Sequence, residues 1–290
     1  QGTRQGSLGL DSVPDYELAR AAIAGGIAQF EGMHVLAPDN TDALYLLTKT
    51  WVGYAFAFVE DDLQAAQDAG DDDLAEYHKK RARNAYDRAV FYGLQLLSQR
   101  AKGFDQAKKN EQTLTKWLTD NFTSQDDAVN LLWTGQAWLL RVGLMQGDDN
   151  EGPQFVADLW IGVAMLDRAK ALDPTPEHYS VLNTLGAYHA RSTLAELDEA
   201  KKDFDLALAK TENKSLMIQF TYASTYACVK GDSVLYQALL NKILQAVDPD
   251  PEQRLANTIA KRRAKRWLGK RRVKDKCGFD VAGAGAVAGK

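Results

Sequence analysis

The sequence predicts an all-α fold, on three observations. Apolar residues recur at helical spacing along most of the 290 residues, and no run of Val, Ile and Thr alternates at period two as a strand would. The seven prolines all lie at the edges of these periodic segments, which is where helical chains tolerate proline. Small and large apolar residues also repeat at fixed offsets, which favours stacked helical hairpins.

The first five expected helices are separated by turn-forming or acidic segments. The first ends before Pro38-Asp39-Asn40, and the second follows the cap residues there and stops at the acidic run 60–62. The third follows the aspartates of 71–73, the fourth is a short insertion around Trp117, and the fifth precedes the loop 147–150. These helices are expected at residues 15–36, 41–59, 73–101, 105–120 and 126–146.

The remaining six helices are divided in the same way. The segment 173–176 contains two prolines, with Thr175 as a cap residue, and Gly231-Asp232 and the Asp-Pro pairs of 248–251 separate the later helices. These helices are expected at residues 153–172, 177–193, 196–211, 214–230, 232–247 and 252–272.

The repeat pattern resembles tetratricopeptide hairpins. In the second helix of such a unit a small residue, a large one and another small one follow at fixed offsets, so that neighbouring helices approach closely. Copies are Gly26/Phe30/Met33, Ala82/Tyr86/Ala89, Gly162/Leu166/Ala169 and Ala200/Phe204/Ala207. The first-helix pattern is clearest at Leu182, Leu185-Gly186 and His189. The copies are unequally spaced, which predicts about four degenerate hairpins in an α-solenoid, an unpaired N-terminal helix and a C-terminal cap.

These patterns predict three segments. Residues 1–12 are Gly-rich and are expected to form a flexible N-terminal arm or tether, and residues 13–272 a single helical-repeat domain. Residues 273–290 end in VAGAGAVAGK and are expected to form a low-complexity tail. The chain begins with Gln1 rather than Met, which favours a processed and exported protein.

Charge is distributed very unevenly along the chain. Residues 261–276 contain ten Lys or Arg and one acid, Asp275, for a net charge of +9. The whole chain carries −4, and Asp280 and Lys290 cancel, so residues 1–260 carry −13. An acidic body with one short basic helix argues against a nucleic-acid binder. No apolar run is long enough to span a bilayer.

The sequence contains no recognisable catalytic or metal-binding pattern. His34, His78, His178 and His189 are scattered without ligand spacing, and the acidic loops lack the spacing of a calcium loop. Cys228 lies in a helical pattern and Cys277 in the basic tail, and two cysteines do not make a disulfide framework. We therefore predict a non-enzymatic protein without a cofactor or metal.

Aromatic residues concentrate on the expected first helices of the hairpins. First helices line the concave face of such stacks, so aromatic side chains there can line a groove or pore for an apolar ligand. Packing between helices is the alternative for most of these positions. The candidates are Tyr45, Trp51, Tyr54, Phe58, Trp133, Trp138 and Tyr222.

The basic helix 252–272 is amphipathic. Four interpretations remain open: a solvated cap on the stack, a docking face for an acidic partner, a contact with anionic lipid, and a nucleic-acid patch. The cap ranks first, because the end of a helical stack needs a polar cover.

Five segments together resemble the TatT-type T component of TRAP transporters. The resemblance runs from about Asp11 to Trp267, and its C-terminal segment is close to the family's signature there. The segments are DNTDALYLLTKTWVGYAFAFVEDD (39–62), RARNAYDRAVFYGLQLL (81–97), RAKALDPT (168–175), LNTLGAYHARS (182–192) and LANTIAKRRAKRWL (255–268).

The resemblance implies a periplasmic, usually lipid-anchored protein of degenerate tetratricopeptide hairpins that forms a homotrimer with a central pore. Its partner would be a periplasmic solute-binding protein, and its cargo a hydrophobic ligand or lipid. Nucleic acid is not expected as a partner, and the membrane is expected only through an N-terminal lipid anchor. The loop 193–198 is shorter than the family's glycine-rich insertion there.

On this basis the hypothesis is a TRAP-type component that docks a solute-binding protein and offers an apolar groove or pore for ligand transfer. Phe58 and Glu60 are expected at the end of a pore-facing helix, and Glu60, Asn257, Arg263 and Arg266 are the predicted partner contacts. The alternative is a structural scaffold subunit of a larger exported complex, which uses the same helical-repeat surface for protein–protein interaction.

Overall fold

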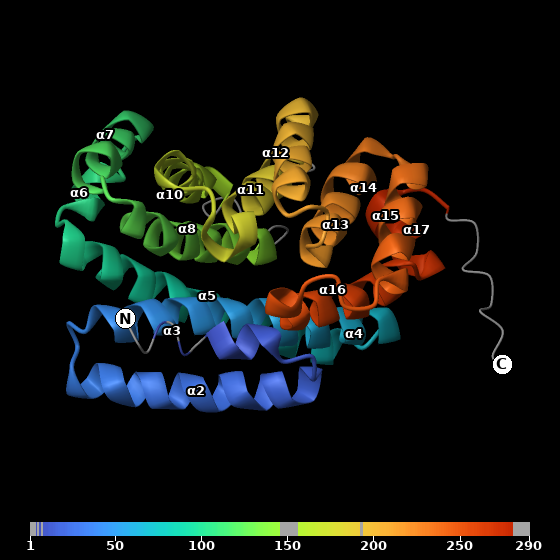
Figure 1. Cartoon of the computed structure of the whole chain (residues 1–290), viewed down its shortest axis with the longest axis horizontal. Coiled ribbons are helices and arrows are strands. Elements are labelled where there is room, and N and C mark those ends of the chain that lie inside the picture. The colour runs from blue at the N-terminus through green and yellow to red at the C-terminus, as the bar shows by residue number, and fades with distance from the viewer. Residues whose placement is uncertain (1–3, 5, 7, 146–155, 192–193, 281–290) are drawn as a thin grey trace. The chain divides into compact units, whose positions relative to one another are not determined.

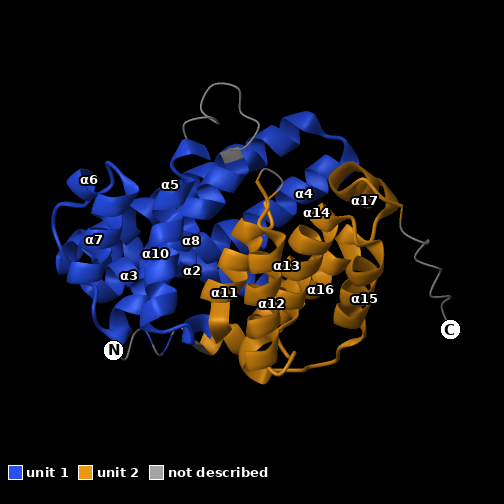
Figure 2. Cartoon of the chain, turned by 90° about the horizontal axis from the view of Figure 1, so that it is seen from above, with its two compact units in different colours: residues 1–7, 17–177 blue, residues 8–16, 178–290 orange. Residues whose placement is uncertain are grey.

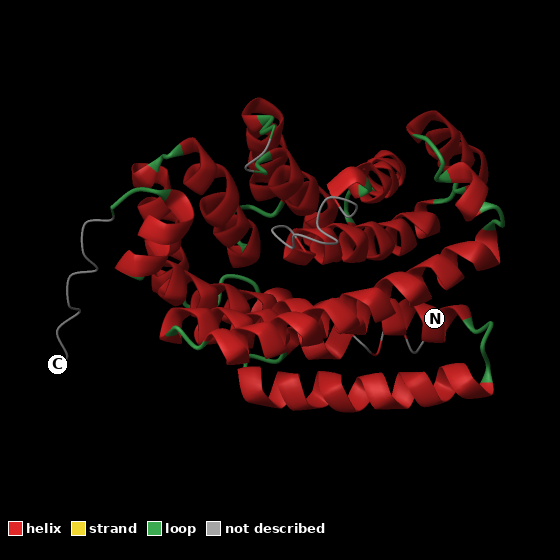
Figure 3. Ribbon diagram, turned by 180° about the vertical axis from the view of Figure 1, so that it is seen from behind, coloured by secondary structure: helices red, strands yellow, loops and turns green. Residues whose placement is uncertain are grey.

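The computed structural model describes residues 4, 6, 8–145, 156–191 and 194–280, and these residues form helices, turns and no strand (Figures 1 and 3). The all-α prediction is confirmed. The loop predicted at 147–150, the first residues of the helix predicted at 153–172 and most of the low-complexity tail lie outside the described residues.

The chain divides into two compact units (Figure 2), and the single repeat domain predicted over residues 13–272 stays a prediction. Unit 1 comprises residues 1–7 and 17–177, and unit 2 comprises residues 8–16 and 178–290.

Unit 1 is built from α2 to α10 with polar caps at several helix starts. Its elements are α2 (Tyr16–Leu36, from Glu17), α3 (Thr41–Tyr54), η2 (Ala55–Val59), α4 (Glu60–Ala69), α5 (Asp72–Arg100), α6 (Phe104–Ala107), α7 (Glu111–Asn121), α8 (Gln125–Met145) and α10 (Leu159–Leu172). The Asn40 side chain accepts from the amides of Asp42 and Ala43, which confirms the cap predicted before α3.

Within unit 1, α3 packs on α5, α5 on α8, and α8 on α10. Glycines permit the closest of these approaches. A Cβ atom at Gly135 of α8 would lie 2.9 Å from the Gly162 carbonyl oxygen and 3.0 Å from Leu166 Cγ of α10. The small and large positions of the predicted repeat therefore pack as the repeat pattern requires.

The helix predicted at 41–59 does not stop at the acidic run 60–62. It continues through one π-helical segment, η2, into α4 and ends at Gly70, whose φ of 74° forms a left-handed C-cap. Asp61 is only 1% exposed, so this acidic run is part of a packed helix rather than a solvated end.

Unit 2 contains the later helices and the η1 segment. Its elements are η1 (Leu8–Ser12), α11 (Pro176–His189, from His178), α12 (Leu197–Lys210), α13 (Leu216–Tyr222), η3 (Ala223–Ala227, also π-helical), α14 (Cys228–Lys230), α15 (Ser233–Gln245), η4 (Pro251–Gln253), α16 (Arg254–Trp267) and α17 (Lys270–Cys277). Residues 8–12, predicted as part of a flexible arm, form η1, which packs on α16.

Helices α11, α12 and α13 of unit 2 meet around Phe204. A Cβ at Gly186 of α11 would lie 3.0 Å from the Phe204 ring, so glycine is required for this close contact. On its other side the Phe204 ring stacks on Tyr222 with centroids 4.7 Å apart. Phe204 is completely buried, as its place in the predicted repeat requires.

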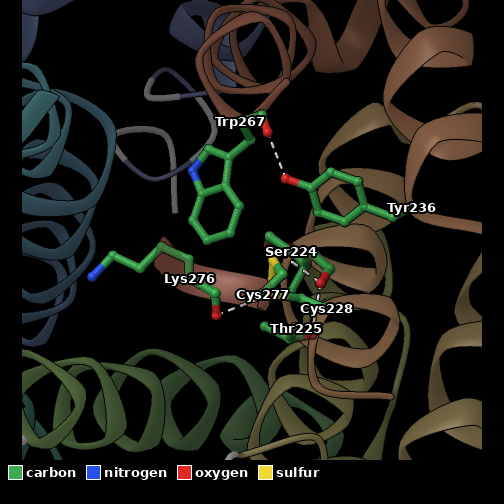
Figure 4. Close-up of a disulfide and its surroundings, with 8 residues drawn as sticks. Ser224, Thr225, Cys228, Tyr236, Trp267, Lys276 and Cys277 are labelled. Carbon is green, nitrogen blue, oxygen red and sulfur yellow. Dashed lines mark hydrogen bonds between the residues drawn. A yellow bond between two sulfur atoms is a disulfide. The ribbon is translucent and has the colours of Figure 1, made fainter. Parts of the chain in front are cut away.

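The C-terminal helix predicted at 252–272 is two helices, because the chain breaks at Leu268-Gly269 before α17. Residues 273–277, predicted to belong to the tail, are helical, and Cys277 forms a disulfide with Cys228 (Figure 4). The two cysteines predicted to make no disulfide framework therefore join α17 to α14. The Tyr236 hydroxyl donates to the Trp267 carbonyl at 2.6 Å and ties α15 to the end of α16.

Candidate functional site

The six predicted aromatic residues of unit 1 differ in burial. Phe58 is fully buried, and Tyr45 and Trp138 are each 6% exposed. Trp51, Tyr54 and Trp133 are half-buried, and Trp51 and Trp133 pack against a core cluster that contains Tyr45, Leu46 and Leu47. Their assignment to a groove or pore stays a prediction.

Three side chains, two from α3 and one from α8, converge on the carboxylate of Glu177. Lys49 Nζ lies 2.9 and 3.0 Å from its two oxygens, and the Tyr45 hydroxyl and the Trp133 indole N–H each donate at 3.3 Å. Lys49 also lies 5.5 Å from the centre of the Trp133 ring. We call Tyr45, Lys49 and Trp133 the Glu177 cluster.

The carboxylate of Glu31 in α2 accepts hydrogen bonds from the same kinds of donor: an indole, a cation and a phenol. The Trp51 indole N–H donates at 3.0 Å, Arg88 at 3.0 Å and the Tyr92 hydroxyl at 2.5 Å. Buried Trp and Tyr side chains need acceptors for their polar hydrogens, and these two glutamates provide them.

The segment of the α3–η2–α4 helix on either side of η2 is held by α2 and α5. Arg20 of α2 binds Asp62 through two nitrogens at 3.0 and 2.6 Å, and Arg81 of α5 donates to the Tyr54 hydroxyl at 2.8 Å. The predicted partner contact Glu60 accepts from the Tyr86 hydroxyl. Tyr54 and Glu60 thus bond to two different residues of α5, Arg81 and Tyr86.

Trp138 of α8 is separate from these clusters. Its indole N–H donates to the Asp158 carbonyl at 2.9 Å, and the Arg141 guanidinium lies 4.6 Å from the ring centre. Burial lowers the pKa of Arg141 from its usual value, although Asp87 opposes this effect.

Tyr222, the predicted ligand residue of unit 2, is packed in the interior. It is 5% exposed, stacks on Phe204, and donates from its hydroxyl to Asp205 at 3.3 Å. Burial is the main cause that raises its pKa, and Asp205 adds to it.

Two of the predicted partner residues on α16 are buried. Asn257 is 4% exposed, and its Oδ1 accepts from the Leu216 amide at 3.0 Å, which caps α13. Arg263 is 3% exposed, with its guanidinium carbon 6.0 Å from the Phe220 ring centre. Arg266 is half-buried.

A pocket of about 350 Å³ lies beside Asn257 in unit 2. Part of its lining is already engaged, since Arg254 binds Asp248 and Lys261 Nζ donates to the Val247 carbonyl at 2.9 Å. Its lining residues are Pro14, Val247, Asp248, Pro249, Arg254, Asn257, Thr258 and Lys261.

Six exposed cations lie along α16 and α17. We call this set the basic face; its members are Arg262, Lys265, Lys270, Arg271, Lys274 and Lys276. Arg271 lies 3.6 Å from Asp275, the single acidic residue of the segment 261–276. The Cys228–Cys277 disulfide fixes the end of α17 that carries Lys274 and Lys276 (Figure 4).

The pH dependence of stability tests the Glu177 cluster. Burial, with the Glu177 carboxylate beside it, raises the pKa of Tyr45 to about 12 from a usual value of 10.0. A phenol whose pKa is higher in the folded chain stabilises the fold below about pH 10, and this contribution is lost as the pH rises from about 10 to about 12. We expect the free energy of unfolding to fall less steeply across this window in Tyr45→Phe than in wild type. Urea denaturation at a series of pH values measures both slopes, and equal slopes would contradict the burial of Tyr45.

The structure shows two further properties of the described residues. No group of three or more His, Cys, Asp or Glu side chains in residues 4, 6, 8–145, 156–191 and 194–280 is arranged to hold a metal ion. In the same residues, no helix combines the length and the apolar character that crossing a membrane requires.

The chain matches a known protein family. The family model described as TRAP transporter T-component matches residues 12–273, which includes nearly all helices of both units. A search of curated proteins finds no match.

Proposed function

The chain belongs to the TRAP transporter T-component family, and from this premise we propose that it docks a periplasmic solute-binding protein and offers an apolar groove or pore for ligand transfer. It is a component of a TRAP transport system. The proposal includes a non-enzymatic role, a periplasmic location with an N-terminal lipid anchor, and assembly as a homotrimer.

The observation that carries the docking proposal is the basic face of α16 and α17. Its cations are exposed, while residues 1–260 carry a net charge of −13, so the face is the strongest positive feature of an acidic chain. The described side chains of α17 that are exposed are all polar, which favours an acidic protein surface over insertion into lipid. The disulfide supports the periplasmic location, because disulfides persist in oxidising compartments such as the bacterial periplasm.

Arg263 is unsuitable for testing this proposal, because reversing a buried charge would unfold the protein. Lys265 and Lys274 are exposed on the basic face and can be reversed without that cost. We expect Lys265→Glu/Lys274→Glu to weaken capture of the cognate solute-binding protein about tenfold at low salt, with a smaller effect at high salt. Affinity is measured with both purified full-length proteins by biolayer interferometry.

The matched control is Lys202→Glu/Lys210→Glu, which reverses two exposed cations of α12 in the same unit. This control is expected to bind as wild type does. Equal weakening by the two double variants would show a general charge effect and would contradict docking through the basic face. If the protein captures no solute-binding protein and carries no apolar molecule when it is purified gently, the scaffold alternative replaces this proposal.

A further inference from the structure

Helix α17 has a sequence that is unfavourable for a free helix. It comprises eight residues, Lys270–Cys277, and five of them are cations against the one acid Asp275, for a net charge of +4. Its first turn contains three of these cations and no acid, and the N-cap residue Gly269 makes no side-chain hydrogen bond. Cations at a helix N-terminus oppose the helix dipole, and isolated helices shorter than about 12 residues are marginal in water. The helix therefore depends on its contacts with the rest of unit 2.

The contacts of α17 differ between its two halves. In the first half Val273 is completely buried, and Arg272 is 6% exposed, with its guanidinium 5.8 Å from the centre of the Trp267 ring. At the other end the disulfide joins Cys277 to Cys228 of α14 (Figure 4). The first half is thus held by packing and the second half by a covalent bond.

The second half of α17 has little other attachment. Residues 274–276 are all exposed, and the half-buried Phe279, which contacts the Tyr236 ring with centroids 5.3 Å apart, lies beyond the end of the helix. Cys277 is half-buried, so it is the more accessible cysteine of the pair, since Cys228 is 6% exposed. Opening the bond therefore removes the main attachment of a short, strongly positive segment.

We propose that the redox state of Cys228 and Cys277 switches the basic face between a docking form and a released form. In the oxidised docking form α17 is fixed, and its four exposed cations join the two of α16 in one preformed set. A preformed set binds a partner without first being ordered. In the reduced, released form α17 detaches by local unfolding, and its cations are no longer positioned. This inference rests on the proposed function, since it names the regulation of the docking face.

The redox step is thiol–disulfide exchange with a protein that carries a dithiol. A thiolate of that protein attacks one sulfur of the Cys228–Cys277 bond, and the other cysteine leaves as a thiolate and takes up a proton. The second thiol of the co-reactant then resolves the mixed disulfide, so two electrons and two protons pass to the cysteines and the dithiol becomes a disulfide. The reverse exchange with an oxidised protein of this class closes the bond. In an oxidising compartment the docking form is therefore the resting state.

Limited digestion of the full chain with trypsin tests the release of α17 without any partner. We expect reduction by dithiothreitol, or Cys277→Ser, to speed cleavage within residues 270–276 at least about tenfold, because a detached segment is open to the protease. The matched control is cleavage after Lys265 of α16, which should stay as slow as in the oxidised protein. Unchanged cleavage in α17 would overturn the proposal, and so would equal acceleration at Lys265, which would mean that unit 2 unfolds as a whole.

Biolayer interferometry with the cognate solute-binding protein tests the effect on docking. Oxidised wild type is expected to bind about tenfold more tightly than Cys277→Ser. Lys274→Glu, on α17, should weaken capture in the oxidised wild-type background and not in Cys277→Ser, whereas Lys265→Glu, on α16, should weaken it in both. Dithiothreitol should leave capture by Cys277→Ser unchanged, which controls for effects on the partner. An equal loss from Lys274→Glu in both backgrounds would contradict the switch.

The two readouts separate failure of this inference from failure of the proposed function. If α17 stays resistant to trypsin after reduction while both charge reversals weaken capture, docking through the basic face holds and the switch is wrong. If reduction releases α17 but neither charge reversal changes capture, docking through the basic face is wrong, and its redox control falls with it.

Discussion

Replacing Cys277 by serine is expected to lower the free energy of unfolding of unit 2 by about 4 kcal/mol. The disulfide joins residues separated by 49 positions, and closing a loop of that length restricts the unfolded chain strongly. It also fixes α17, a short helix that has few buried residues of its own, Arg272 and Val273. Denaturation in urea, followed by circular dichroism under oxidising conditions, measures the loss.

Reduction of the wild-type protein provides the control for this variant. Dithiothreitol should lower the stability of wild type to that of Cys277→Ser and should leave the variant unchanged. Equal stability of oxidised wild type and Cys277→Ser would mean that Cys228 and Cys277 are not paired in the folded protein.

Phe204→Ala is expected to destabilise unit 2 by about 3–5 kcal/mol, the usual cost of removing a buried phenylalanine ring. The ring is completely buried, and it fills the space between Gly186 and Tyr222. Neither neighbour can fill the cavity easily, because Gly186 has no side chain and Tyr222 is bonded to Asp205. Thermal unfolding of the purified protein gives the loss.

Leu206→Ala is the matched control, since it shortens a large side chain of the same helix that is 43% exposed. Its effect on stability should be small, because little buried surface is removed. A small effect of Phe204→Ala would show that α11, α12 and α13 do not depend on this ring for their contact.

The sequence predicts those parts of the fold that depend on local chemistry. Asn40 could be identified as a cap because its side chain bonds to amides only two and three residues away. Gly186 and Phe204 could be identified as a small and a large position of the repeat, because the repeat offsets state which positions are small and which are large. The continuation of α3 through η2 could not be predicted, because a run of three acidic residues is as typical of a helix end as of a buried turn.

The sequence predicts the members of the candidate site better than their arrangement. Tyr45 and Trp133 were identified as aromatic residues of first helices, but their common partner Glu177 is 132 residues from Tyr45. Buried indole and phenol groups need a hydrogen-bond acceptor, and this need indicates that an acidic residue lies beside them. It does not indicate which of the 39 acidic residues is the acceptor. Asn257 and Arg263 are predicted as partner contacts, and their burial follows from long-range packing of α13 on α16.

The π-helical segment η2 gives one continuous helix two differently oriented faces. Each residue of an α-helix turns the chain by about 100°, so the wider turn of η2 changes the phase of every side chain after it relative to those before it. Tyr45 and Lys49 keep the phase that directs them to Glu177, while Glu60 and Asp62 have a second phase that directs them to Tyr86 and Arg20. A single helix thereby makes two sets of contacts, with bonds to Glu177 before the phase change and bonds to α2 and α5 after it.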